Sequence, residues 1–473
     1  MSASIQPSST ILLPELPPKT LVGIDLITFT STANFHGIKD LPNGWHFLYT
    51  GTTESLSLRS GAWFYVGDVT ATQHEYKELS LVPQKQKHSE QSKPEILIWK
   101  WNTDTESLAS LRSESDSDSQ EAMRYKANLG AIWQSGGLFQ FRSRVPKSST
   151  TDIAQTSTQS EVTLIDDDDE TEASGRADWR RLTDCITPNV LMRIIGPPNI
   201  DVDARSRWMV TSASTADCDA DNIPGLDPQR VDKDGVPRTT GEQERDIWFL
   251  PIDLKHTWPA GAIGRERTEA AQDRSWALGS LIHRLSRAVH PVTGEPSFDE
   301  EQAERDFLGE VQFTFLMVLT MMNYSCLQQW KRMLELVLTS RSAIVDREPF
   351  MAEFLALLLR QLQRCDDVEG GLFEMDGDDG GAFLRDLLKK FRRLVYQILE
   401  DDSTSRVKQE LSNLEKWLKE EYDWELTHEV FVKRGMVRLE DGEEIELDME
   451  DNDEDEETGE YAPMVVDSEE TML

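Results

Sequence analysis

Few side chains in the sequence stand at spacings that could perform catalysis. His46 lies in a short apolar run, Trp45–Tyr49. A histidine in such a run is more often a hydrogen-bonded, half-buried core side chain than a general base. Cys326, inside an apolar helical pattern, is likewise a core residue rather than a nucleophile. No Gly-x-Ser-x-Gly nucleophile motif occurs in the sequence. We therefore expect no catalytic residues, and a protein that is not an enzyme.

Phosphate and metal sites have no better support. The sequence lacks a phosphate-binding loop ending in Gly-Lys-Ser/Thr and a dinucleotide fingerprint. The stretch 376–381 begins like a calcium loop, but its twelfth position is Leu387, where a bidentate glutamate is required. The eight histidines and four cysteines do not show metal-ligand spacing. We predict no cofactor and no metal, and a solvated loop at 376–381.

Charge narrows the class of partner. The formal net charge is −37, and residues 440–473 hold seventeen Asp or Glu and no Lys or Arg. Nucleic acid binding depends on Lys and Arg displacing counterions from phosphates, so we expect no direct contact with nucleic acid. A basic protein surface is the natural complement of such a chain. The acidic run has two interpretations, a solubilising extension or a competitor for basic surfaces that would otherwise hold RNA.

Two hydrophobic patterns divide the chain. From 11 to 101, short apolar runs separated by turn residues predict a β-rich domain. The expected strands are Val22–Ile27, Trp45–Tyr49, Trp63–Val66 and Ile96–Trp101. The turn residues of Asp40–Gly44, with Pro followed by Asn-Gly, predict a hairpin. From Glu266 to Trp424 the period becomes 3.6 and predicts about six helices in a bundle or stack.

Length and composition indicate two domains with two separate cores, joined by segments that stay unfolded. The expected division is a disordered N-terminus at 1–10, a β-rich domain at 11–211, a linker at 212–244, a helical domain at 245–425 and an acidic tail at 426–473. Acidic and Ser-rich insertions at 102–121 and 146–175 are expected to be mobile. A short amphipathic helix interrupted by Pro188 is expected over 179–195.

The chain offers no membrane segment. Its longest apolar run, Phe313–Met322, has ten residues, whereas a membrane-spanning helix needs about 20. No signal peptide is recognisable at the N-terminus, and the scattered cysteines suggest a reducing compartment. We expect a soluble protein of the cytoplasm and nucleus.

Three stretches of this sequence resemble the Aar two family of splicing factors. They appear in the family's order and cover both domains. The first contains Gly23, Asp25, Phe35, Gly37, Lys39, Pro42, Gly44 and His46. The second is Trp179–Thr183. The third contains Gly309, Glu310, Gln312 and Phe313, followed by Trp330, Lys331 and Arg332 and later by Leu358–Leu362.

The resemblance implies a fold and a function. It implies a β-sandwich-like N-terminal domain followed by an all-α domain of the VHS type, and hence an α+β multidomain protein. Members of the family are non-enzymatic assembly chaperones of the U5 snRNP. They bind the RNase H-like and Jab/MPN domains of its large scaffold protein, and they keep the spliceosomal RNA helicase off until assembly is complete. We expect the same of this chain, acting as a monomer.

The resemblance extends to the tail and to regulation. Residues Ala462, Pro463, Met464, Val465 and Val466 resemble the family's Ala-Pro-aliphatic ending and suggest a strand that adds to a sheet edge of the scaffold; an unstructured end is the alternative. Phosphorylation is the family's release signal. Ser113 and Ser115 are candidate sites, because each has an acid three residues further on.

A different functional class stays open as an alternative. Acidic tails are also typical of chaperones of histones or ribosomal proteins, and the tail alone would suit such a role. Because the family resemblance covers both domains, the sequence favours the splicing interpretation over this one.

Overall fold

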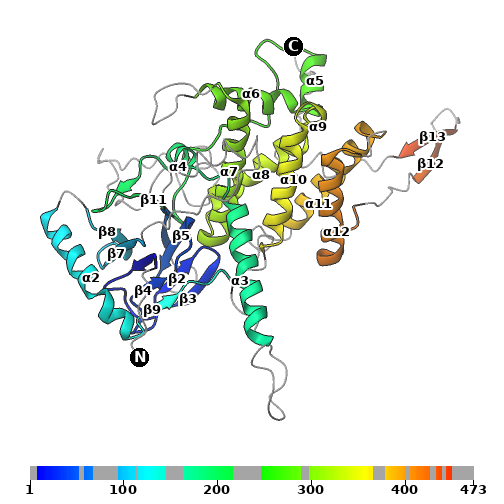
Figure 1. The fold of residues 1–473 in the computed structure, drawn as a ribbon. Coiled ribbons are helices and arrows are strands. Elements are labelled where there is room, and N and C mark those ends of the chain that lie inside the picture. Colours follow the sequence, from blue (N-terminus) through cyan, green and yellow to red (C-terminus); the bar gives the residue numbers. More distant parts are fainter. Residues whose placement is uncertain are drawn as a thin grey trace, which may run out of the picture.

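The computed structural model describes residues 8–52, 58–67, 94–112, 115–144, 163–216, 247–288, 298–365, 379–400, 404–426, 433–438 and 444–449. The elements lie in layers: helix α2 (Asp116–Gln134), two β-sheets, and then a group of helices (Figure 1). The described chain thus has the α+β layout that the sequence predicts, with β-structure first and helices after it.

The outer sheet has strand order β8-β7-β1-β4-β9 and packs against α2. Its strands are β1 (Thr10–Leu12), β4 (Gly37–Lys39), β7 (Ile96–Asn102), β8 (Ser107–Ser110) and β9 (Leu138–Gln140). Strand β1 pairs in parallel with β7, and β4 pairs in parallel with β9. The α2 face of this sheet is apolar and includes Leu12, Ile98 and Leu138.

The inner sheet has strand order β10-β11-β6-β5-β2-β3 and is antiparallel. Its strands are β2 (Leu21–Ile24), β3 (Ile27–Thr30), β5 (Gly44–Gly51), β6 (Arg59–Val66), β10 (Asn199–Ile200) and β11 (Ser206–Thr211). Successive side chains of a strand face opposite sides. Along β5, Leu48 packs in the core between the sheets, while Trp45, Phe47 and Tyr49 join the core shared with the helices. Both faces of this sheet are therefore apolar.

The helical region surrounds one long central helix. Helix α7 is buried from Phe307 to Met321, and α6 and α8 pack beside it. Two helices precede the last two strands of the inner sheet in the chain, α3 (Thr163–Leu182) and α4 (Pro188–Ile195). The helices that follow that sheet are α5 (Arg265–Gln272), α6 (Ser275–Arg287), α7 (Glu300–Met321), α8 (Tyr324–Leu338), α9 (Ala343–Asp346), α10 (Glu348–Leu362), α11 (Asp379–Ile398) and α12 (Arg406–Tyr422). Five of the helices that the sequence predicts correspond to α6, α8, α10, α11 and α12. The nearly all-apolar stretch is α7, as its composition indicates.

The two regions share one core, whereas the sequence suggested two separate ones. A single buried cluster runs from Trp45, Phe47 and Trp63 on the inner sheet to Phe313 on α7 and onward through the helices. The rings of Trp63 and Phe313 lie 6.3 Å apart, centroid to centroid. The inner sheet presents a second apolar face to the helices, and this packing joins the two regions into one body.

Two turn predictions differ from the structure. The strands on either side of 40–43, β4 and β5, do not form a hairpin: β4 belongs to the outer sheet and β5 to the inner one. The backbone of this turn bonds elsewhere, since the Leu41 N–H donates to the Ser9 carbonyl. The predicted strand Val22–Ile27 is instead a tight hairpin of β2 and β3, in which Asp25 adopts a positive φ of 56°.

Two insertions predicted to be mobile contain helix. In the 102–121 insertion, β8 is followed by α2, whose N-cap is Ser115. The serines and acids there favour the start of a helix, because a Ser side chain caps the first turn and acidic side chains in that turn interact well with the helix dipole. In the 146–175 insertion, α3 already begins at Thr163. The expected helix over 179–195 is the end of α3 followed by α4, with Pro188 in the first turn, where its missing N–H costs nothing.

Several predictions fall outside the described residues. These are the predictions for residues 1–7, for most of the linker (217–246) and for residues 450–473 of the tail. Within the expected tail, β12 (Lys433–Arg438) pairs antiparallel with β13 (Glu444–Met449). Among the described helices, none combines the length and the apolar character needed to cross a membrane.

Candidate functional site: a cleft beside the junction of sheet and helices

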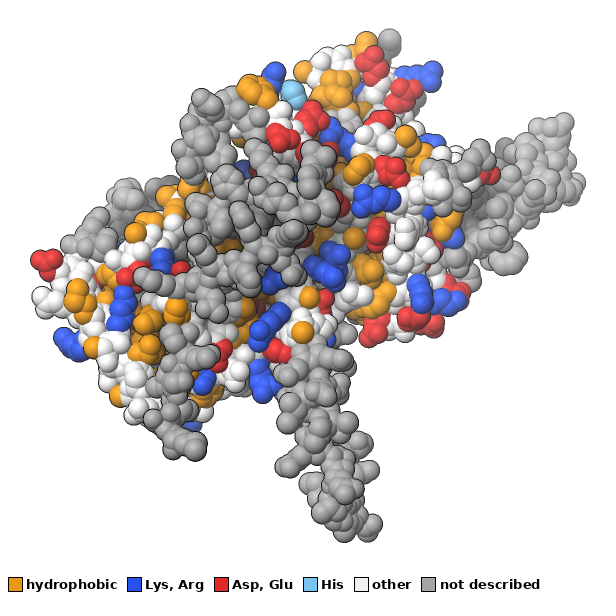
Figure 2. Space-filling view, viewed as in Figure 1, with side chains coloured by type: hydrophobic (Ala, Val, Ile, Leu, Met, Phe, Trp, Pro, Cys, Tyr) orange, Lys and Arg blue, Asp and Glu red, His pale blue; other side chains and the backbone are white. Residues whose placement is uncertain are grey.

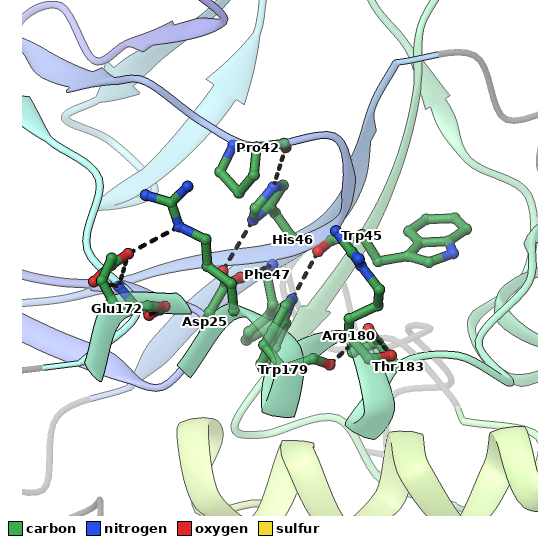
Figure 3. Close-up of polar contacts among 11 residues, drawn as sticks. Asp25, Pro42, Trp45, His46, Phe47, Glu172, Trp179, Arg180 and Thr183 are labelled. Carbon is green, nitrogen blue, oxygen red and sulfur yellow. Dashed lines mark hydrogen bonds and ion pairs between the residues drawn. The ribbon is translucent and has the colours of Figure 1, made fainter. Parts of the chain in front are cut away.

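A buried ion pair fixes the turn that joins the two sheets. The His46 Nδ1 lies 2.9 Å from Asp25 Oδ2, and its Nε2 lies 2.8 Å from the Pro42 carbonyl oxygen. The Phe47 N–H donates to Asp25 Oδ1 over 3.0 Å. Both side chains of the pair are almost fully buried. Figure 3 shows the His46 ring between Asp25 and Pro42. His46 is thus the hydrogen-bonded core histidine that the sequence suggested, but buried rather than half-buried.

The two partners of this histidine are both hydrogen-bond acceptors. Both ring nitrogens can donate only when the imidazole is protonated. Burial lowers the pKa of His46, but the nearby Asp25 charge, its hydrogen bond and the Pro42 carbonyl together raise it above the ordinary value. The structure therefore favours a charged His46 paired with Asp25, and this pair holds the turn between the two sheets in place.

Helix α3 ends against this turn. The Trp179 indole N–H donates to the Trp45 carbonyl oxygen over 2.8 Å, and the Trp179 ring stacks on Trp63 at 6.1 Å. The Thr183 hydroxyl donates to the Trp179 carbonyl over 2.9 Å (Figure 3). Trp179 and Thr183 are the outer residues of the second family stretch, which therefore joins α3 to the inner sheet.

A cleft of about 400 Å³ opens between the turn and the end of α3. Its wall is mostly apolar, and four aromatic side chains contribute to it, Trp45, Tyr65, Phe141 and Trp179. Arg176 and Arg180 of α3, both exposed, also line it, together with His46 and several small polar side chains. A concave, mostly apolar wall with a few charged groups is the usual form of a binding site. The cleft is therefore the candidate functional site.

A second buried polar group joins α7 to the rest of the chain. The Glu310 side chain is fully buried and accepts hydrogen bonds from the Leu250 N–H at 3.0 Å and from the Gln329 amide at 2.8 Å. Arg193 of α4 forms an ion pair with the same carboxylate. One side chain of the third family stretch therefore connects α4, α8 and the segment that enters the helical region.

Gly309 and Gln312 make the neighbouring contact with the connection between α3 and α4. The Gln312 side-chain oxygen accepts from the Cys185 N–H at 2.9 Å, and its amide donates to Asp184 at 2.6 Å. A Cβ on Gly309 would lie only 2.4 Å from the Cys185 carbonyl oxygen. Glycine is required at 309 because the two backbones approach so closely.

The other family residues in the sheets also have structural positions. Gly23 leaves room for the Tyr49 ring, since a Cβ there would lie 2.0 Å from that ring. Phe35 is buried against Phe29 and Phe139. Gly37 passes close to the Ile11 carbonyl oxygen, Lys39 lies 4.7 Å over the Trp133 ring, and Gly44 has a φ of +137°.

The family residues of the helical region are brought together in the same way. The Trp330 indole N–H donates to the Gln361 side-chain oxygen over 3.0 Å, so two parts of the third stretch touch. Lys331 lies 5.2 Å over the Phe383 ring, and Arg332 is half-buried on the same helix. Phe313 faces the inner sheet. Cys326 is fully buried on α8, as the sequence predicted.

The regulatory and tail predictions have a different outcome. Ala462, Pro463, Met464, Val465, Val466 and Ser113 lie outside the described residues. Ser115 is described: its hydroxyl accepts from the Asp118 N–H at 3.3 Å and caps α2.

Sequence reasoning missed several contacts of the junction. Arg193 was not singled out, and neither was Asp178. The Asp178 carboxylate pairs with Arg144 and also with Arg364, which follows the end of α10. No local pattern indicates them, because Arg193 and Glu310 are 117 residues apart and Asp178 and Arg364 are 186 apart. Within the described part of the chain, no group of three His, Cys, Asp or Glu side chains is placed to share a metal ion.

Comparison with known proteins agrees with the resemblance seen in the sequence. The AAR2 N-terminal domain matches residues 7–196, and the AAR2 C-terminal repeat region matches residues 249–427. Proteins named "Protein AAR2 homolog" from Macaca fascicularis and Mus musculus are each 24% identical over 362 residues, and the human one is 23% identical over 363. Each alignment covers 75% of both chains. The two matched domains meet at the junction described above, and the chain belongs to the AAR2 family, the Aar two family of the sequence analysis.

Proposed function

We propose that this chain is a pre-mRNA splicing factor that chaperones assembly of the U5 snRNP. It binds the RNase H-like and Jab/MPN domains of the large U5 scaffold protein and excludes the spliceosomal RNA helicase until it is released. The helical domain is proposed to be of the VHS type, and the protein to act in cytoplasm and nucleus as a monomer. The observation that supports this most is the family match across both domains.

The places of the polar family residues support the proposed binding role. The polar family residues Asp25, His46, Glu310 and Gln312 are buried and use their polar atoms for bonds inside the protein. The bonds of Glu310 and Gln312 cross between the two domains and hold them in one orientation, which is what a partner that contacts both domains requires. The net charge of −37 opposes binding to RNA itself and suits a basic protein surface.

The tail contributes a second, weaker contact in this proposal. Residues 462–466 add a strand to a sheet edge of the scaffold, and the β12–β13 hairpin lies upstream of them. About five main-chain hydrogen bonds at roughly 1 kcal/mol each give weak binding alone. Tethered to a docked body, the same strand raises overall affinity by about a hundredfold.

The experiment measures affinity of the purified chain for the two C-terminal scaffold domains by calorimetry, at moderate salt. The full chain is expected to bind at micromolar concentration or better, and a chain lacking 461–473 to bind about a hundredfold more weakly. A chain with residues 461–467 scrambled keeps the composition and charge, and separates strand pairing from electrostatics. No binding by the full chain would contradict the function, and equal binding by all three chains would remove the tail from it.

Release is proposed to depend on phosphorylation of Ser113 or Ser115. A phosphate on Ser115 would lie at the first turn of α2, next to Asp116 and Asp118. The helix end attracts a phosphate and the two carboxylates repel it, so the cap would be remodelled. Replacing Ser113 and Ser115 by Glu should weaken scaffold binding. The control is Ser135→Glu, at the other end of α2, which should leave scaffold binding unchanged. Unchanged affinity would exclude both serines.

Pull-down followed by mass spectrometry separates this proposal from the other functional class. U5 scaffold protein is the expected companion. Recovery of histones or ribosomal proteins in its place would favour the acidic-tailed chaperone.

A further inference from the structure

The cleft beside the junction combines an apolar wall with a cationic edge. Trp45, Tyr65 and Trp179 contribute aromatic surface, and Arg176 and Arg180 line the same opening. Glu310, Gln312 and the Asp25–His46 pair use their polar groups within the junction. Several other polar residues of the lining are also bonded within the chain, such as Thr183 to the Trp179 carbonyl and Thr187 to the Val190 N–H. The exposed arginines are therefore the groups of the cleft best placed to meet a ligand.

The two arginines stand one helical turn apart on α3. Residues at this spacing share a face of a helix, and like charges there repel each other slightly. Arg176 is paired with Glu172 at 3.1 Å, while within the described ranges no carboxylate forms an ion pair with Arg180. Arg180 lies in the last turn of α3, where the helix dipole favours a cation, but Arg176 lies a turn before it and is outside that effect. The helix end therefore does not account for the pair.

The cleft also has one acid. Asp184 lines it, but its carboxylate accepts a hydrogen bond from Gln312 of α7 at 2.6 Å. The carboxylate is thereby held toward the helical region. A ligand that suits the whole cleft needs an apolar group, preferably aromatic or Pro, next to negative charge.

One segment of this chain has that composition. Residues 460–467 read Glu-Tyr-Ala-Pro-Met-Val-Val-Asp and follow a run of acids. We propose that this segment docks in the cleft of its own chain when no partner is bound, with Tyr461 and Pro463 against the aromatic wall and Glu460 near Arg180. The same segment that is proposed to pair with a scaffold is then masked in the free protein.

The length of chain between the two sites allows this contact. Leu426 is the last described residue of the helical body, and the β12–β13 hairpin brings Lys433 and Met449 side by side, so residues 434–448 add no reach. The length left up to Tyr461 is 19 residues, seven before the hairpin (433 − 426) and twelve after it (461 − 449). At about 3.3 Å per residue they reach about 60 Å, which is on the order of the width of a domain of this size. Tethering gives an effective concentration of about 1 mM. A contact with an intrinsic Kd of about 100 µM would then be closed in roughly ten molecules out of eleven.

The first test uses the full chain with Tyr461 replaced by the photoreactive amino acid benzoylphenylalanine. Irradiation of the dilute protein is expected to give intramolecular cross-links to 42–46, 141–143 or 176–188, and fewer of them at high salt. Cross-links confined to other segments, or found only between molecules, would overturn the proposal.

The second test measures fluorescence anisotropy of a labelled peptide of residues 456–471. The peptide is expected to bind a chain ending at 449 about tenfold more tightly than it binds the full chain, whose own tail competes. Arg180→Glu and Tyr65→Ala in the shortened chain should each weaken peptide binding at least fivefold. Arg265→Glu, on a side chain that is 90% exposed on α5, carries the same charge change away from the cleft and should have no effect.

The outcomes separate this inference from the proposed function. Equal peptide binding by the shortened and full chains, or equal losses for Arg180→Glu and Arg265→Glu, would refute docking in the cleft. Because neither assay contains a scaffold domain, such a result would leave the proposed splicing role to its own test.

Discussion

Glu310 is the most buried charged side chain at the domain junction, and its removal should destabilise the whole protein. Glu310→Ala leaves the Leu250 N–H and the Gln329 amide without their acceptor in a site where the carboxylate is 0% exposed. Each unsatisfied buried donor costs about 1–3 kcal/mol. Arg193 is 24% exposed and can turn toward water, so it adds less. The expected loss is about 3–5 kcal/mol, as for other broken buried ion pairs.

Urea unfolding followed by tryptophan fluorescence measures this loss. The matched control is Glu335→Ala, because Glu335 pairs with Arg274 at 2.6 Å but is 32% exposed. That change should cost about 1 kcal/mol or less, since water replaces the lost partner. Glu310→Gln keeps one acceptor oxygen and should fall between the two. Equal losses for Glu310→Ala and Glu335→Ala would refute the reasoning from burial.

Two further predictions concern the junction and the turn. Gly309→Ala brings a Cβ to 2.4 Å from the Cys185 carbonyl oxygen and should lower the free energy of unfolding by about 1–3 kcal/mol. The control is Gly279→Ala on α6, where a Cβ would have no neighbour within 4 Å, so the change should be neutral or stabilising. Similar urea midpoints for both variants would contradict the close approach at Gly309. His46 has a raised pKa when folded, so the stability that it contributes is fully present below about pH 6.5, its unfolded value, and is lost as pH rises through the folded value. The free energy of unfolding of the native chain should therefore decline over that window more than that of His46→Gln. Parallel pH profiles would show that folding does not raise the pKa of His46.

The sequence predicts the broad fold because hydrophobic period is a local property. The change from short apolar runs to period 3.6 marks the passage from the sheets to the helices α6–α12, and Trp45–Tyr49 lies within β5, although α2, α3 and α4 lie among the strands. The turn at 40–43 shows the limit. Pro, Asn and Gly specify a reversal of the chain. They do not specify whether the flanking strands pair with each other, and here each strand finds partners in a different sheet.

The same limit applies to α2 and to the junction. Alternating serine and acid has the composition of a mobile loop, but Ser115 followed by Asp116 and Asp118 is also a helix start, and packing of Ala122 against the outer sheet decides between the two. Gly309, Glu310 and Gln312 stood out by family resemblance alone. Their roles depend on Cys185 and Leu250, which are distant in sequence, and no local pattern reveals such partners.

The continuous core between the inner sheet and α7 bears on how interactions of this protein are mapped. A cut within 217–246 would divide the chain into two fragments, and each would expose hydrophobic surface that is buried in the intact protein. Trp63 and its neighbours would be exposed on one fragment, and Phe313 and its neighbours on the other. Fragments of that kind are prone to aggregation and to non-specific binding. Two-hybrid or pull-down screens with half-length fragments would consequently report false interaction partners. Point substitutions in the full-length chain avoid this problem.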